Sequence, residues 1–265
     1  MSSSPDKTTH SVRGETLQLF SGVCGERERS RTAKYYRRGS AKILDEFFFS
    51  LLEEARIKDF MECGAHEATA TRIFLKNGGK RALAIEANPE IYNRKTQKVS
   101  ELGAEVVNVG LAEKVGSLDF YIPEKNLGAA SFRTKRDGEK KIVIPTTTID
   151  ELREKHSLNG HLALWVDVEG FALEVLSGAR KTLASRETLI LKVEMEHRPR
   201  WREQKTYLEV ARLLEEADFV PIIGDIEYVD QFNIVYARRD VIAGHEELVA
   251  STHDRMRELV ETAPL

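Results

Sequence analysis

The chain has 265 residues, enough for one large domain or two small ones, and an apolar fraction of 41% permits a packed core. Its net charge is −3 and 31% of its residues are charged, which gives a solvated surface but no general attraction to nucleic acid or to an acidic membrane. Its two cysteines, Cys24 and Cys63, fall in unrelated settings and indicate neither a disulfide nor a zinc site. This cysteine usage fits a protein of a reducing compartment.

The first 39 residues are predicted to form a flexible, basic, partly helical arm. Residues 1–40 carry eight Lys or Arg against four acids. We interpret this segment either as a solvated arm or as a segment whose residues 35–38 cover the active site or contact an anionic substrate. The arm lacks the apolar segment of a secretory signal, and no apolar run reaches the ~18 residues of a membrane helix. We therefore expect a soluble, cytoplasmic protein without a membrane span.

From residue 40 onwards, helical and strand-like apolar spacings alternate. Residues 40–55 predict a helix that begins at Ser40, because their apolar side chains recur three or four residues apart. Strands are then predicted at 57–64, 80–88 and 104–112, with helices at 67–79 and 89–103 between them. Strand–helix–strand units form right-handed parallel crossovers, so this order predicts a parallel sheet covered on both faces.

Residues 113–147 interrupt this order. Two short alternating segments, 116–124 and 141–150, flank a polar loop, which predicts a β-hairpin insertion whose loop is a candidate substrate lid. The remaining predicted elements are helices at 146–157, 171–185, 206–218 and 244–263 and strands at 162–170, 188–196, 219–225 and 231–239. The chain therefore divides into an arm (1–39), one α/β domain (40–240) and a C-terminal helix (241–265).

The residues that end each predicted strand are the candidates for ligand binding, because open parallel sheets bind ligands beyond the carboxyl ends of their strands. Gly64 permits a sharp turn and the close approach of a ligand, and Glu86 is placed to accept hydrogen bonds from a ribose diol. Asn108 and the turn at Gly110 could face a purine edge. The candidate cofactor contacts are Glu62, Gly64, Ala65, His66, Glu86, Ala87, Asn88, Asn108, Gly110, Leu111 and Asp167.

Glu62 bears on which cofactor the sheet binds. A pyrophosphate favours a helix N-terminus free of negative charge, whereas a cationic sulfonium or amine tolerates a carboxylate. The turn also lacks the spacing G-x-G-x-x-G, which disfavours a nicotinamide-dependent oxidoreductase. That oxidoreductase and a cofactor-binding module without catalysis stay as alternatives, and Glu62 and Glu86 could also be solvated strand ends.

Three stretches resemble one known family, the FkbM-type S-adenosylmethionine-dependent methyltransferases. They are "FMECGAHEAT" at 60–69, "AIEANPEIY" at 84–92, and "TTTIDEL" at 146–152 with "LALWVDVEGFALEVLSGA" at 162–179. The resemblance extends over about residues 57–238. Departures from the family pattern include Ala68 in place of Gly and Trp165 in place of Lys.

This resemblance implies a class I methyltransferase fold with a doubly wound, mostly parallel, seven-stranded sheet. The β-hairpin insertion and the N-terminal helical arm, which the residue pattern predicts, are added to it. It implies S-adenosyl-L-methionine as cofactor and methyl transfer, usually to a hydroxyl oxygen. Such a transfer needs in-line alignment and a base, for which Asp167, Glu169 and His197 are the candidates in that order.

The acceptor is expected to be a saccharide or another small molecule, and N-methylation stays open. No metal site is predicted, although Asp167, Glu169, Glu194 and Glu196 offer hard oxygen ligands for magnesium or calcium as an alternative. The two terminal helices could pair with a second subunit and form a homo-oligomer.

Overall fold

The computed structural model describes residues 31–124, 127–134, 140–228 and 230–262. Most of the predicted arm, together with Cys24, lies outside these residues, while Cys63 is a buried free thiol. No helix among the described residues is both long enough and apolar enough to cross a membrane.

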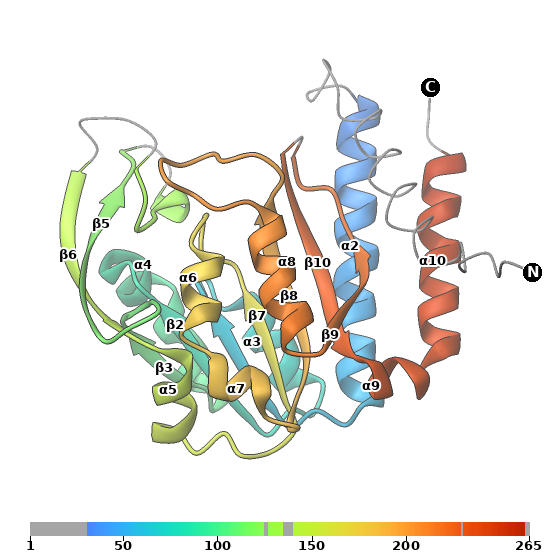
Figure 1. The fold of residues 1–265 in the computed structure, drawn as a ribbon, viewed down its shortest axis with the longest axis horizontal. Coiled ribbons are helices and arrows are strands. Elements are labelled where there is room, and N and C mark those ends of the chain that lie inside the picture. Colours follow the sequence, from blue (N-terminus) through green and yellow to red (C-terminus); the bar gives the residue numbers. More distant parts are fainter. Residues whose placement is uncertain (1–30, 125–126, 135–139, 229, 263–265) are drawn as a thin grey trace, which may run out of the picture.

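A seven-stranded sheet forms the centre of the molecule, as expected (Figure 1). Its strand order is β3-β2-β1-β7-β8-β10-β9. The strands are β1 (Asp59–Cys63), β2 (Arg81–Glu86), β3 (Glu105–Asn108), β7 (Leu162–Val166), β8 (Thr188–Glu196), β9 (Phe219–Gly224) and β10 (Gln231–Arg238). β10 pairs antiparallel with both β8 and β9, and the other neighbouring strands are parallel. The predicted class I, mostly parallel sheet is confirmed.

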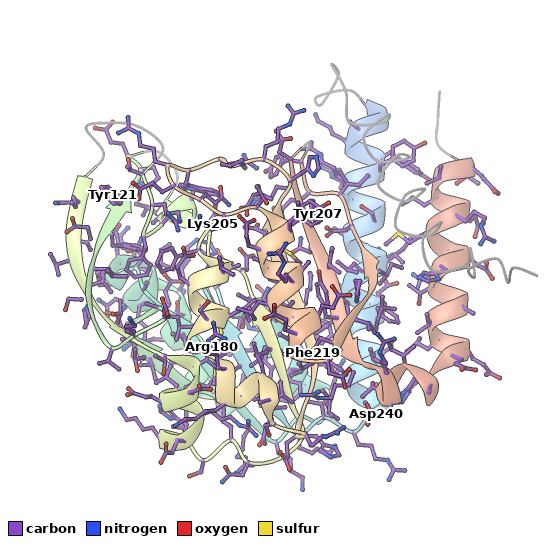
Figure 2. All side chains as sticks on the ribbon, viewed as in Figure 1. Tyr121, Arg180, Lys205, Tyr207, Phe219 and Asp240 are labelled. Carbon is purple, nitrogen blue, oxygen red and sulfur yellow. The ribbon has the colours of Figure 1, made fainter. Side chains whose placement is uncertain are left out.

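Helices cover both faces of the sheet, because successive strand residues alternate between two apolar clusters. Phe60 and Ala163 pack with α2 (Arg31–Glu54) and α3 (Thr69–Lys76), while Met61 and Leu164 pack with helices of the opposite face. That opposite face is covered by α5 (Ile149–Lys155), α6 (Ala172–Ser177), α7 (Arg180–Ala184) and α8 (Tyr207–Glu216), and the side chains that fill it are drawn in Figure 2.

A second, three-stranded sheet contains the predicted hairpin. β5 (Gly116–Ile122) pairs antiparallel with β6 (Lys140–Thr147), and β4 (Gly110–Leu111) pairs with β6 in parallel. The strand expected at 104–112 is therefore divided, because its last part leaves the main sheet for this one. The connection between β5 and β6 includes the short helix η2 (Leu127–Ala129), and residues 135–139 of the expected lid lie outside the described part.

Two further predicted elements differ in extent. The helix expected at 89–103 is divided into α4 (Pro89–Arg94) and a 3-10 helix, η1 (Thr96–Leu102). At the start of η1, the Thr96 hydroxyl donates a 2.6 Å hydrogen bond to the carbonyl of His66, so the interruption ties this segment to the loop after β1. The helix expected at 171–185 is likewise divided into α6 and α7.

The expected helix start at Ser40 is wrong, because α2 already begins at Arg31. Ser40 is buried inside the helix and its hydroxyl accepts the N–H of Ile226, in the segment after β9. α2 lies beside α10 (Glu246–Glu261) at one end of the molecule, and α9 (Arg239–Ala243) leads into α10 (Figure 1). The Tyr36 hydroxyl donates to the carbonyl of Val260, so the two terminal helices of one chain pack on each other.

Candidate functional site

A cavity of about 440 Å³ opens at the carboxyl ends of the parallel strands, within the size range of small-molecule sites. Its wall combines the ends of β1, β2 and β7 with the inserted sheet and the segment between β9 and β10. The lining residues are Gly64, His66, Ile85, Glu86, Ala87, Ile91, Val109, Leu111, Phe120, Leu127, Gly128, Ala129, Ala130, Phe132, Asp167, Val168, Glu169, Arg200, Glu227, Tyr228 and Gln231.

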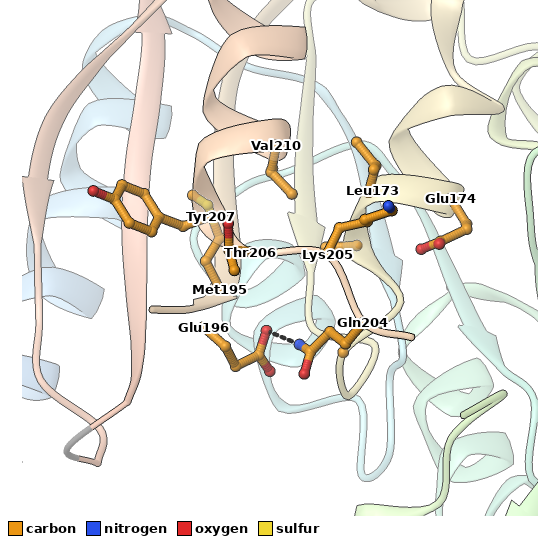
Figure 3. Close-up of a pocket in the computed structure, with 11 residues that line it drawn as sticks. Leu173, Glu174, Met195, Glu196, Gln204, Lys205, Thr206, Tyr207 and Val210 are labelled. Carbon is orange, nitrogen blue, oxygen red and sulfur yellow. Dashed lines mark hydrogen bonds between the residues drawn. The ribbon is translucent and has the colours of Figure 1, made fainter. Parts of the chain in front are cut away.

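A second pocket lies between α6 and α8 and is drawn in Figure 3. Its volume is about 10 Å³, room for about one water molecule. It is lined by Glu196 and Gln204, whose side chains hydrogen-bond to each other at 2.5 Å. The larger cavity at the strand ends is therefore the candidate functional site.

Glu62 holds the turn after β1 rather than facing the cavity. Its carboxylate accepts the N–H groups of Ala70 and Thr71, at 3.3 and 2.8 Å, and the Thr71 hydroxyl at 2.5 Å. These amides belong to the first turn of α3, where a phosphate would otherwise find unpaired donors. Burial raises the pKa of Glu62 to about 7 in spite of these hydrogen bonds. The occupied helix start argues against a pyrophosphate cofactor at this turn.

Position 64 must be a glycine because the backbone of Asp167, at the end of the adjacent strand, lies too close for a Cβ. The φ of Gly64 is +82°, and a Cβ built there would lie 1.8 Å from the backbone oxygen of Asp167. The chain turns sharply at Gly64, as expected. The group that approaches Gly64 most closely is the backbone at the end of β7, whereas a ligand was expected there. His66 and Ala68 continue the turn with φ values of +47° and +54°. This turn has left-handed conformations at two residues that carry a Cβ, a strained arrangement typical of ligand-binding loops.

Glu86 lies at the end of β2 with its carboxylate on the cavity wall. One oxygen accepts the N–H of His66 at 2.8 Å and the other accepts the N–H of Asn88 at 2.7 Å. Its exposed fraction is 7%, and burial raises its pKa. Each carboxylate oxygen has a further lone pair, so Glu86 can also accept hydrogen bonds from a diol in the cavity.

His66 belongs to the turn after β1 and lines the cavity. Burial, together with the nearby charge of Lys95, lowers the pKa of its imidazole, which favours the neutral ring. Its backbone N–H and carbonyl are both bound, to Glu86 and to Thr96. His66 is thereby fixed beside the position that a nucleoside would take next to Glu86.

Several residues predicted to contact the cofactor lie outside the cavity lining and pack against or hydrogen-bond to the residues that form it. The Asn108 amide donates to the carbonyls of Glu86 and Ala87 at 2.7 and 3.2 Å, so it is turned toward the end of β2 and does not line the cavity. Asn88 caps α4 by accepting the N–H of Glu90. Ala65, also outside the lining, is buried in the core, and a Cβ on Gly110 would lie 2.2 Å from the ring of Phe132. Leu111, in contrast, lines the cavity.

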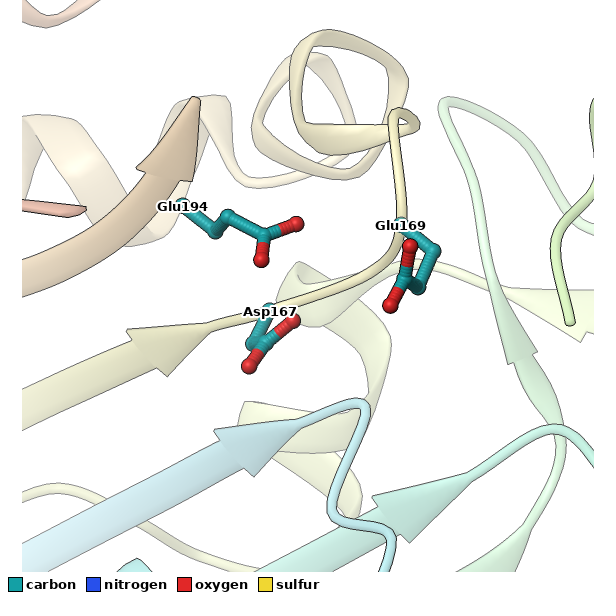
Figure 4. A group of neighbouring side chains, drawn as sticks. All are labelled: Asp167, Glu169 and Glu194. Carbon is teal, nitrogen blue, oxygen red and sulfur yellow. The ribbon is translucent and has the colours of Figure 1, made fainter. Parts of the chain in front are cut away.

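Two of the three candidate bases lie at the cavity, and the third does not. Asp167 and Glu169 follow β7 and line the wall, with Glu194 of β8 beside them (Figure 4). Burial, followed by the charge of Glu227, raises the pKa of Asp167 to about 7, and burial raises the pKa of Glu194 well above its usual range. His197 is exposed, stacks on Tyr207 with ring centroids 5.5 Å apart, and lies outside the lining.

Three polar cavity residues were not singled out from the sequence: Arg200, Glu227 and Gln231. Arg200 donates to the side chain of Gln231, and its guanidinium lies 5.2 Å from the ring centroid of Tyr228. Arg200 lies in the loop after β8, Glu227 lies between β9 and β10, and Gln231 is the first residue of β10, so none of them directly ends a parallel strand. The basic run around Arg200 in "HRPRWRE" was the available signal, but its position depends on tertiary structure.

Comparison with known proteins gives one family model, described as the methyltransferase FkbM domain, which matches residues 62–221. Among curated proteins, the hexuronic acid methyltransferase AglP of Haloferax volcanii is 29% identical over 178 residues, covering 64% of this chain and 72% of the relative.

Solved structures with similarity include two methyltransferases. The magnesium protoporphyrin IX methyltransferase of Synechocystis, with bound S-adenosylmethionine, has a TM-score of 0.43 at 13% identity over 90% of this chain and 100% of that one. An rRNA methylase of Streptococcus thermophilus has a TM-score of 0.42 at 12% identity over 75% of this chain and 96% of that one.

Proposed function

The chain belongs to the FkbM family of S-adenosylmethionine-dependent methyltransferases, and from this premise we propose that it methylates a hydroxyl oxygen of an acidic sugar. The supporting observation is the lining of the cavity, to which the ends of β1 and β2 and the segments after β8 and β9 contribute different residues. We assign the strand ends to one half of the cavity and the two later segments to the other.

The cofactor belongs in the half bounded by Gly64, His66 and Glu86. Glu86 accepts the ribose hydroxyls with its remaining lone pairs, because its carboxylate is already fixed by two backbone N–H groups. S-adenosylmethionine supplies an activated methyl group when it is bound. The apolar side chains of Ile91 and Leu111 on the same wall suit the adenine ring.

The acceptor belongs in the half that contains Arg200. Among the described lining residues, Arg200 is the only Lys or Arg. Its guanidinium forms no ion pair with any described residue and is held by the neutral Gln231 and by the ring of Tyr228. Arginine binds carboxylates in bidentate geometry, so the sugar expected here carries a carboxylate. The relative named as a hexuronic acid methyltransferase supports the same class of acceptor.

Asp167 is the proposed base, with Glu169 as the second candidate. Asp167 lies on the cavity wall at the end of β7, between the two halves. The reaction requires the acceptor oxygen, the methyl carbon and the sulfur to lie in line, and the hydroxyl proton to leave as the new bond forms. A carboxylate at this position can take that proton while the protein holds the two substrates.

The test is methyl transfer from isotope-labelled S-adenosylmethionine to paired sugars that differ only in a carboxylate, such as a glucuronide and the matching glucoside. We expect product with the uronate and a kcat/KM at least tenfold lower with the neutral sugar. Arg200→Gln should remove most of that preference, whereas Arg198→Gln, which changes an exposed neighbour outside the cavity lining, should keep it.

Equal rates with both sugars would contradict the acidic acceptor, and a methyl ester at the carboxylate instead of a methyl ether at a hydroxyl would contradict the proposed acceptor atom. Asp167→Asn should lower kcat at least 100-fold while the Kd for S-adenosylhomocysteine changes less than threefold. That separation is expected because a base acts on bond formation, not on cofactor binding.

A further inference from the structure

Three carboxylates converge where β7 and β8 end at the cavity. Asp167, Glu169 and Glu194 each offer one oxygen, and these three oxygens all lie within 4.8 Å of one another (Figure 4). Like charges this close repel strongly in a partly buried site. Lys192 lies on the same face of β8, but its ammonium is paired with Asp45 of α2 and lies 3.7 Å from the ring centroid of Trp165.

Glu194 gives a second and independent observation. Its exposed fraction is 5%, and its carboxylate forms no hydrogen bond or ion pair with any residue in the described part of the chain. Figure 4 shows it directed toward Asp167 and Glu169. A buried carboxylate without a donor is costly, so a partner from outside the chain is expected.

Neighbouring buried acids show that such donors are otherwise supplied by the chain. Glu196, two residues further along β8, accepts a 2.5 Å hydrogen bond from Gln204 (Figure 3). Asp225, at the end of β9, accepts the backbone N–H of Asn233 at 2.7 Å and is also contacted by the Asn233 amide. Glu194 differs from both acids, because the polar neighbours recorded for its carboxylate are the oxygens of Asp167 and Glu169.

We propose that Asp167, Glu169 and Glu194 bind one divalent cation, Mg²⁺ or Mn²⁺, at the cavity wall. Carboxylate oxygens are the preferred ligands of these ions, and opposite ligands of Mg²⁺ lie roughly 4.2 Å apart, from a metal–oxygen distance of about 2.1 Å. The three oxygens lie within 4.8 Å of one another, so small side-chain movements bring them to this geometry. Three protein ligands leave about three of six octahedral positions open on the cavity side.

The open positions face the cavity, because Asp167 and Glu169 line its wall. Water or oxygen atoms of a hydroxyl-rich ligand can fill them. Each carboxylate contributes one ligand oxygen, so the second oxygen of Asp167 stays available as a base. Binding of the metal alone does not depend on the identity of the acceptor.

The full chain is treated with chelator, desalted and titrated with Mn²⁺. Binding is measured as the loss of the electron paramagnetic resonance signal of free Mn²⁺. We expect the wild type to bind one Mn²⁺ per chain and Glu194→Gln to bind at least tenfold more weakly. Glu196→Gln is the matched control, because it makes the same change on the same strand face outside the group of three. Its Kd should stay within twofold of wild type.

Two results would overturn the proposal: no Mn²⁺ bound by the wild type at millimolar concentration, or equal Kd values for the wild type and Glu194→Gln. If Glu194→Gln does not fold, Glu169→Gln, which changes a residue of the loop, is measured in its place. We expect the same tenfold loss of affinity for Mn²⁺, and an unchanged Kd would contradict the site. At the same Mn²⁺ concentration, the Tm of the wild type and of Glu196→Gln should rise more than the Tm of Glu194→Gln. No acceptor enters these assays, so the acidic-sugar proposal can fail while the metal site stands.

Discussion

Glu86 is the side chain on which the proposed cofactor site depends most. It is fixed by the N–H groups of His66 and Asn88, and its remaining lone pairs face the cavity. Hydrogen bonds to a charged group contribute about 1.5–3 kcal/mol each. Even one such bond corresponds to a factor of roughly 10 to 150, so Glu86→Ala should weaken binding of S-adenosylhomocysteine at least roughly tenfold, measured by calorimetry. Glu101→Ala, an exposed acid in η1, is the control, and an unchanged Kd in Glu86→Ala would refute the assignment.

Gly64 provides a test of the strand ends that does not require a ligand. A Cβ at this position would lie 1.8 Å from the backbone oxygen of Asp167. Gly64→Ala should lower the free energy of unfolding by at least about 3 kcal/mol, since both backbone strain and overlap must be relieved. Gly78 has a similar φ of +88° with no atom within 4 Å of the added Cβ, so Gly78→Ala should lose only about 1 kcal/mol. Similar losses in denaturant titrations of the two variants would contradict the close approach.

At the scale of elements, the capping of α3 by Glu62 predicts a dependence of stability on pH. Burial raises the pKa of Glu62 to about 7 in the folded protein, above its ordinary value of 4.5. The folded state therefore binds the proton more tightly, and this contribution is present below about pH 4.5 and is lost as the pH rises through 7. The change is about 3 kcal/mol over that interval.

Glu62→Gln should reduce this dependence by about that amount, because the amide does not ionise, while Asp167, whose pKa is also raised, continues to contribute. The check is the free energy of unfolding measured by denaturant titration at several pH values from 5 to 8 in both proteins. Parallel pH curves for the variant and the wild type would show that Glu62 is not the titrating group.

The main elements were predictable from the sequence because their signals are local. Alternation and long apolar runs identify the strands, and the acids at the ends of β1, β2 and β7 mark the carboxyl edge where the cavity lies. Glu86 and Asp167 could therefore be assigned to the cavity in advance. Nothing local distinguishes β4 from the end of β3, since the same apolar residues pair with β6 only once the hairpin has folded.

The remaining site residues depend on long-range packing. Asn108 was expected to face a ligand, yet its amide binds carbonyls at the end of the adjacent strand. Arg200 reaches the cavity from a loop that the strand pattern does not mark, and His197 in the same loop points elsewhere, toward Tyr207. Side-chain direction in such loops is decided by contacts across the fold, which spacing along the chain does not reveal.

At the scale of the whole molecule, the terminal helices stabilise the sheet at the end remote from the inserted hairpin (Figure 1). α10 packs on α2, and its Leu248, Val249 and Met256 side chains contact the core cluster beneath α2. Truncation after His245 should expose this surface and lower the free energy of unfolding by about 3 kcal/mol, which corresponds to a Tm lower by roughly 6–12 °C. Scanning calorimetry measures this change.

Cofactor binding should survive that truncation, because no described residue of α10 lines the cavity. The Kd for S-adenosylhomocysteine is expected to stay within twofold of the full chain below the new melting temperature. A large loss of affinity in the still folded truncated protein would assign α10 a part in the site as well as in stability.

A crystal structure of the protein with S-adenosylhomocysteine tests the central claim most directly. We predict that the nucleoside occupies the cavity at the carboxyl ends of the strands, with both ribose hydroxyls within hydrogen-bonding distance of Glu86 and with the sulfur toward Asp167. A nucleoside bound elsewhere, or a Glu86 carboxylate that contacts only the N–H groups of His66 and Asn88, would contradict it.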